Sequence, residues 1–169
     1  MSDYLVTAPL ADLTTGPGDA ERAELDALER TFERRTGVWG WLTTVDHKSI
    51  AKRYIATAFT FFLLAGVNAL VMRLQLARPE AGFVGPDRYN QLFTVHGTAM
   101  MFLFAVPIMT AFGLYLVPLM VGTRDVAFPR LNAFGYWTFL IGGLFLFAAF
   151  YLNIGPDTGW FAYVPLSGP

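Results

Sequence analysis

The sequence contains no cysteine, few charged residues and only two histidines. The lack of cysteine excludes disulfide-stapled folds, iron–sulfur clusters and zinc ribbons. Charged residues make up 15% of the 169 residues, whereas about a quarter is typical of soluble domains, so a simple soluble globule is excluded. Because His47 and His96 are the only histidines, this chain alone can supply very few metal ligands.

The overall charge argues against binding to polyanions such as nucleic acid. A formal net charge of −1 creates no field that would attract nucleic acid, so we expect no nucleic-acid partner. What the chain has instead is apolar material, since 54% of its residues are hydrophobic and 16% are aromatic. This composition excludes intrinsic disorder for most of the chain.

The charges are concentrated in the first third of the chain. Residues 1–53 carry nine acidic and seven basic side chains, whereas the remaining 116 residues carry nine charges in all. We expect an N-terminal extension over residues 1–36 that is partly disordered and contains one short helix, DAERAELDALERTFERR. Residues 37–53 combine tryptophans with lysine and arginine, a composition typical of a membrane interface.

Three uncharged stretches follow, over residues 54–72, 89–123 and 131–156. A hydrocarbon core of about 30 Å requires about 20 helical residues, so each stretch is long enough to cross once. No polar turn divides the middle stretch into two spans. The sequence therefore predicts an all-α integral membrane helical bundle, with three transmembrane helices and an outer loop over residues 54–169.

The loop cations predict how these helices are oriented. One side of the predicted bundle collects most of them: Lys48, Lys52, Arg53, Arg124 and Arg130. Since cytoplasmic loops carry the excess of lysine and arginine, the N-terminus is expected in the cytoplasm. The residues after the third helix are then expected outside the cell.

Two polar residues are expected inside the membrane near its outer surface. His96 lies about 10 Å into the second span and Arg73 about 7–8 Å from the same surface, so one cofactor could contact both. His96 could be an axial ligand of haem iron, with Gly97 leaving room for the flat macrocycle, or a histidine hydrogen-bonded between helices. Arg73 could donate to a polar cofactor substituent, although spacing alone favours extension to the lipid headgroups.

On the inner side, Asp125 within the segment TRDVAFPRLN also has two interpretations. It could be a loop carboxylate beside Arg124 and Arg130, which is the plainer of the two. Alternatively it could collect protons at the mouth of a hydrated path, with Asn132 about two helical turns further along. Composition does not decide between them.

Longer motifs carry a resemblance to a known family. The stretches NQLFTVHGTAMMFLFAVP and YLVPLMVGTRDVAFPRLNAFGYW resemble helix II, the following loop and helix III of subunit I of the haem–copper oxidases, with the cytochrome c oxidase branch as the nearest. TTVDHKSI and GPDTGWFAYVPLSG are similar to segments of the same family in order and spacing. The resemblance covers residues 37–169 and leaves residues 1–36 unplaced.

The resemblance assigns roles to five residues. His96 would be one of the two axial ligands of the low-spin haem, with haem a as the expected type. Arg73 would donate a hydrogen bond to the formyl group of that haem, and Trp160 would lie near the haem propionates. Asp125 would be the entrance of a proton pathway, and Asn132 would line it.

The family resemblance also implies cofactors, partners and location. The high-spin haem and copper B would belong to the full subunit, because their ligands are absent from residues 1–169, so the fragment alone would be inactive. The family has about a dozen spans, of which three are present here. Oxidase subunits II and III, cytochrome c and lipid would be the partners, in a multi-pass protein of the bacterial inner membrane.

Two residues depart from the family pattern. Leu114 stands where many members have an asparagine that orders water in the proton pathway, which makes pumping a weaker expectation than oxidase membership. Gln75 stands where many members have a carboxylate that contributes to an outer calcium or sodium site, so that metal is not expected.

Three other functions stay open. The first is a quinol oxidase subunit I, which shares the motifs. The second is a non-catalytic three-helix membrane anchor, in which His96 and Arg73 would be structural. The third is a small di-haem electron carrier formed when two chains each contribute His96.

Overall fold

The computed structural model describes residues 18–32, 37–165 and 167. The chain divides into two units, residues 1–42 and residues 43–169. The first unit contains α1 (Asp19–Phe32), which is the expected short helix, and most of α2 (Gly37–Thr43). The disorder expected at the start of the N-terminal extension falls on residues outside the described ranges.

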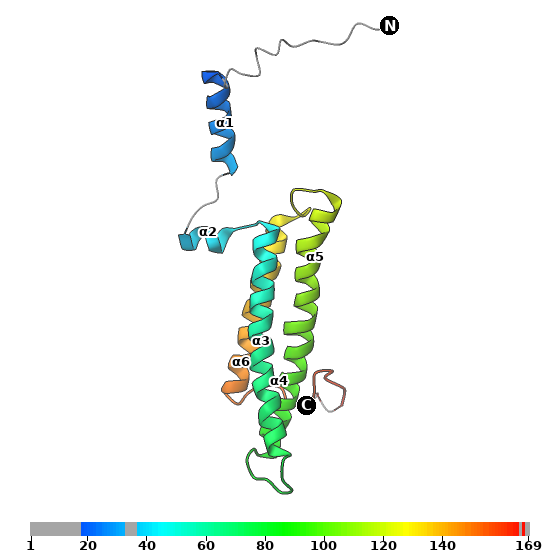
Figure 1. Ribbon diagram of the computed structural model, residues 1–169. Helices are drawn as coiled ribbons and strands as arrows, with labels where there is room; N and C mark the ends of the chain where they lie inside the picture. The colour runs from blue at the N-terminus through cyan, green and yellow to red at the C-terminus, as the bar shows by residue number, and fades with distance from the viewer. Residues whose placement is uncertain (1–17, 33–36, 166, 168–169) are drawn as a thin grey trace, which may run out of the picture. The chain divides into compact units, whose positions relative to one another are not determined.

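The second unit is a bundle of three long helical segments (Figure 1). These are α3 (His47–Gln75), the continuous run of α4 (Pro86–Thr98), η2 (Ala99–Ala105) and α5 (Val106–Val121), and α6 (Pro129–Tyr151). All three are long and apolar enough to cross a membrane. The predicted all-α membrane bundle with three spans is therefore confirmed.

The helix ends follow from local sequence signals. Asp46 caps α3, because its carboxylate accepts from the Ser49 amide at 3.0 Å. α4 and α6 each begin with proline at the first helical position, where the missing amide hydrogen costs nothing. Gly122 follows the last residue of α5, and its φ of 74° lets the Thr123 amide donate back to the Pro118 carbonyl.

The middle span is not a regular α-helix throughout. Residues Ala99–Ala105 form a π-helix, and Val106 donates five residues back to the Met101 carbonyl. Pro107 follows directly and has no amide hydrogen to donate, so the irregular turn coincides with a gap in the hydrogen-bond ladder. The hydrophobic pattern of the span does not predict this turn.

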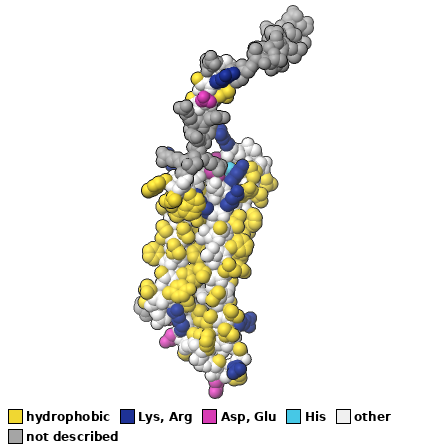
Figure 2. All heavy atoms as spheres, turned by 60° about the vertical axis from the view of Figure 1, so that its left-hand side comes forward, with side chains coloured by type: hydrophobic (Ala, Val, Ile, Leu, Met, Phe, Trp, Pro, Cys, Tyr) yellow, Lys and Arg dark blue, Asp and Glu magenta, His cyan; other side chains and the backbone are white. Residues whose placement is uncertain are grey.

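Helix α3 contacts each of the other segments of the bundle, and the core consists of two clusters along it. The larger cluster comprises Phe61, Ala65, Met72, Leu92, Val95, Ala99, Leu103, Phe147 and Phe150. The smaller one comprises Ile50, Tyr54, Ala111 and Tyr136. Around them hydrophobic side chains cover the long helices, with the charged side chains towards the ends (Figure 2).

We expect Gly143→Ala to destabilise the bundle, because its new Cβ would lie 2.4 Å from Cζ of Phe61. Overpacking of this kind costs about 1–3 kcal/mol. The matched control is Gly142→Ala, whose Cβ meets nothing within 4 Å and faces a groove of about 430 Å³ between α6, η2 and α5. Thermal unfolding of the full-length protein in detergent measures the difference. Equal melting temperatures for the two variants would contradict the Phe61–Gly143 contact.

Candidate functional site

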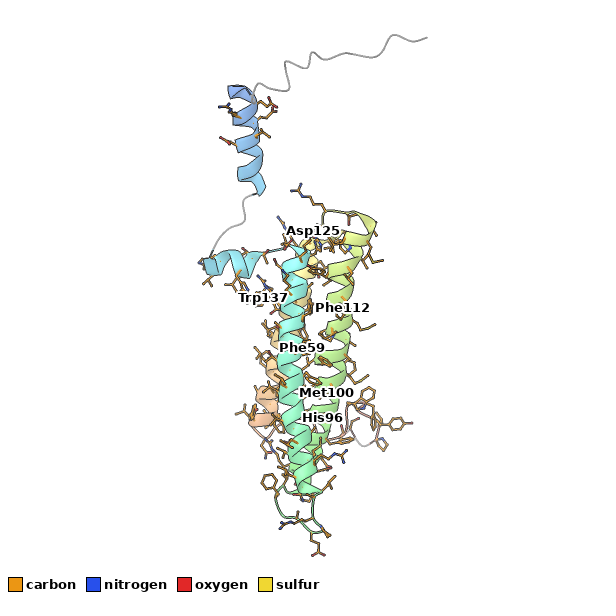
Figure 3. The ribbon with its side chains drawn as sticks, in the orientation of Figure 1. Phe59, His96, Met100, Phe112, Asp125 and Trp137 are labelled. Carbon is orange, nitrogen blue, oxygen red and sulfur yellow. The ribbon has the colours of Figure 1, made fainter. Side chains whose placement is uncertain are left out.

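His96 lies on α4 and is held by a hydrogen bond to α3 (Figure 3). Its Nδ1 lies 2.9 Å from the carbonyl oxygen of Ala65. Because a carbonyl oxygen can only accept, Nδ1 carries the hydrogen, and in the neutral ring Nε2 then has a free lone pair. Within the described part of the chain, Nε2 makes no hydrogen bond, and the residue is half-buried. The ring is therefore oriented and protonated as a metal-ligating histidine requires.

Trp160 lies in the loop that follows α6, and its side chain packs against α4 at Gly97, the residue after His96. A Cβ placed on Gly97 would be 3.0 Å from Cδ1 of the Trp160 ring, so the indole packs directly on that glycine. The space directly over the Gly97 Cα is thus occupied by the indole of Trp160, and the room expected there for a macrocycle stays a prediction. Trp160 itself is 43% exposed and lies beside Phe102, with 6.1 Å between the ring centroids.

Arg73 lies in the last turn of α3 and is exposed. The bond between Ala65 and His96 fixes the level of the two helices, and Arg73 follows Ala65 by eight residues, which is about 12 Å along the axis. The expected similar depth is thus not observed. The predicted depths were counted along the helices from Arg78 for Arg73 and from Tyr89 for His96, as if both residues lay at the membrane surface. In the structure α3 ends at Gln75, and Arg78 belongs to the loop.

Gln75 closes the loop between α3 and α4. Its side-chain oxygen accepts from the Val84 amide at 2.7 Å, and its amide nitrogen donates to the Ala81 carbonyl. The side chain that replaces the family's carboxylate is therefore engaged in backbone hydrogen bonds.

Asp125 lies at the other end of the bundle from His96 (Figure 3), where it contacts His47. His47 Nδ1 is 3.1 Å from Asp125 Oδ1, which also accepts from the Val126 amide at 2.8 Å. His47 is 1% exposed and Asp125 is 34% exposed, so the carboxylate stands between a buried imidazole and the outside of the bundle. A group that exchanges protons with water could pass them inward through this contact.

Sequence reasoning missed the pairing of His47 with Asp125. The available signal was that both residues are predicted on the same membrane side, one at the start of the first span and one before the third. Only the packing of α3 against the loop before α6 makes them neighbours. The structure thus adds a second titratable group to the predicted inner site.

Asn132 lies in the first turns of α6, and its side-chain nitrogen is buried. Among the described residues it has no hydrogen-bond partner, and no hydrogen bond joins it to Asp125. A buried amide in such a position suits an ordered water molecule. Leu114, by contrast, packs against the smaller hydrophobic cluster, where it can order no water.

Comparisons with known proteins identify the family. Residues 49–169 match the family model described as "Cytochrome C and Quinol oxidase polypeptide I". Among curated relatives, cytochrome c oxidase subunit 1 of Alkalihalophilus pseudofirmus is 50% identical over 135 residues, which is 80% of this chain and 22% of that protein. Cytochrome c oxidase subunit 1 of Bacillus subtilis is 46% identical over 143 residues, 85% of this chain and 23% of the relative.

A putative cytochrome c oxidase subunit 1-beta of Streptomyces avermitilis is 52% identical over 128 residues, which is 75% of this chain and 23% of that protein. The chain thus spans less than a quarter of the length of the curated relatives it matches. With the family model covering most of its length and three helices able to cross a membrane, the chain belongs to the cytochrome c and quinol oxidase polypeptide I family of membrane proteins.

Proposed function

We propose that this chain is the N-terminal part of the catalytic subunit of a bacterial respiratory terminal oxidase. The complete enzyme oxidises cytochrome c, reduces dioxygen to water and translocates protons, together with subunits II and III. The names of the matched relatives support cytochrome c rather than quinol as the electron donor. The single observation that carries the proposal is the imidazole of His96, with Nδ1 held by the Ala65 carbonyl and Nε2 free to ligate.

His96 would hold the iron of the low-spin haem, haem a, through Nε2, and that haem would supply one-electron transfer when bound. The Ala65 carbonyl fixes the ring orientation and increases the basicity of Nε2. Arg73 would donate its guanidinium hydrogens to a polar substituent of that haem, and Trp160 would lie near its propionates. Copper B and the high-spin haem would need further ligands, because residues 1–169 contain only two histidines.

Asp125 takes up protons from the cytoplasm and exchanges them with the buried imidazole of His47 at 3.1 Å. Asn132 continues the path through an ordered water molecule at its buried amide. This assignment places the N-terminus in the cytoplasm and the loop after α6 outside, in the bacterial inner membrane. Residues 37–53, which include α2 and its exposed Trp39, lie at the inner interface.

We expect His96→Ala to abolish the low-spin haem band in the visible spectrum of the full-length subunit, because alanine has no nitrogen lone pair with which to ligate the iron. Haem-to-protein stoichiometry and the optical spectrum of the purified protein measure this. An unchanged spectrum would instead support a three-helix membrane anchor. For the unsubstituted protein, a haem-to-protein stoichiometry and oligomeric state in which two chains each contribute His96 would support the di-haem carrier.

We expect Arg73→Met to retain the haem but to shift its absorption band and lower its reduction potential, because a donor that withdraws electron density from the ring is lost. Spectroelectrochemistry of the purified enzyme measures both quantities. Arg78→Met is the matched control, since Arg78 is an exposed arginine of the adjacent loop. A spectrum and potential equal to those of the control would show that Arg73 only reaches the lipid headgroups.

We expect Asp125→Asn to lower oxygen consumption by roughly tenfold or more, because the amide keeps the shape but cannot carry a proton. The oxygen electrode and proton uptake by reconstituted vesicles measure this effect. Glu80→Gln is the control, since Glu80 is an exposed carboxylate of the loop between α3 and α4. Undiminished turnover in Asp125→Asn would remove Asp125 from the proton pathway.

A further inference from the structure

Thr94 makes a buried hydrogen bond between α4 and the loop that follows α6. Its side chain is 1% exposed, and its hydroxyl donates to the Asn90 carbonyl at 2.8 Å within the helix. The same oxygen accepts from the Gly159 amide at 2.8 Å, across 65 residues of sequence. Both hydrogen-bonding functions of the hydroxyl are thus used, and one of them reaches the outer loop.

Gly159 is shaped for this contact. It is buried, and its φ of 91° lies in a backbone region that residues other than glycine rarely adopt. A Cβ at this position would also lie 3.3 Å from the ring of Phe161. The loop therefore presents its backbone amide to Thr94 in one specific conformation.

The next residue in the loop is Trp160, which packs on Gly97 of the same helix. Thr94 and Gly97 lie three residues apart and so on the same face of α4, with His96 between them in sequence. The loop is thus fixed to α4 twice, by a hydrogen bond at Thr94 and by ring packing at Gly97. Both attachments flank the proposed haem ligand.

We propose that Thr94 is a positioning residue, which fixes Trp160 beside His96 and thereby keeps water from the outer side of the low-spin haem. This rests on the proposed function of His96. The reduction potential of a haem depends on its exposure to solvent and on the hydrogen bonds around it. Without the Thr94 hydroxyl, the Gly159 amide loses its acceptor, the loop opens more often, and water reaches the site.

The test compares Thr94→Val, which keeps the shape but removes the hydroxyl, with Thr94→Ser, which keeps the hydroxyl. Both are made in the full-length oxidase complex. Hydrogen–deuterium exchange of the peptide covering residues 155–163 reports on the loop, and redox titration reports on the haem. We expect exchange about tenfold faster or more in Thr94→Val, together with a lower potential, and wild-type values in Thr94→Ser.

Thr110→Val is the matched control, because the Thr110 hydroxyl donates to the carbonyl four residues back but reaches no loop. It should change neither readout. If Thr94→Val does not accumulate, Thr94→Ala removes the same acceptor with a smaller side chain and is held to the same expectation.

Three results would overturn the inference: unchanged exchange in Thr94→Val, faster exchange with an unchanged potential, or the same changes in Thr94→Ser. These outcomes are separate from failure of the proposed function, which is a haem spectrum that survives His96→Ala. In that case the exchange measurement still decides whether Thr94 fixes the loop.

Discussion

The hydrogen bond from His96 to the Ala65 carbonyl is the constraint on which the outer site depends. It joins α3 and α4 at one level and settles which imidazole nitrogen carries the hydrogen. A backbone carbonyl inside an α-helix is already an acceptor for the helix, so a second donor can approach it only where the side chains are small. Ala65, which is fully buried, provides that small side chain. The ligating geometry of His96 therefore depends on the choice of alanine one helix away.

The middle span connects the two proposed sites. His96 belongs to α4, and Asp125 follows the end of α5, so the run of 26 residues from His96 to Val121 is about 38 Å long at helical rise. A single helical run thus places the proposed haem ligand and the proposed proton collector near opposite ends of the bundle. The π-helix interrupts this element between them. Since such turns change the direction in which later side chains point, η2 also sets which face of α5 turns towards α3.

The sequence was sufficient for the architecture but only partly for the sites. The number of membrane spans could be predicted, because it depends only on the lengths of the uncharged, apolar stretches. The depth of Arg73 relative to His96 could not be predicted in this way. Counting from the charged loop residues assumes that they mark the helix ends, whereas α3 ends at Gln75, before Arg78. Thr94, His47 and the position of Trp160 were not predictable either. Each depends on a contact between segments at least 63 residues apart, and no local pattern encodes such a contact.

Contacts at glycines illustrate why the packing between helices could not be predicted from the sequence. In a membrane, helices gain no hydrophobic energy by associating, so close packing at small residues determines their arrangement. Phe61 packs on Gly143 and thereby seats α6 against α3, while Gly66 and Gly113 receive no side chain at all. The loop after α6 then reaches α4, where Trp160 packs on Gly97. Each of these two contacts between segments therefore needs a glycine, Gly143 for the packing of α6 on α3 and Gly97 for the ring next to the proposed haem ligand.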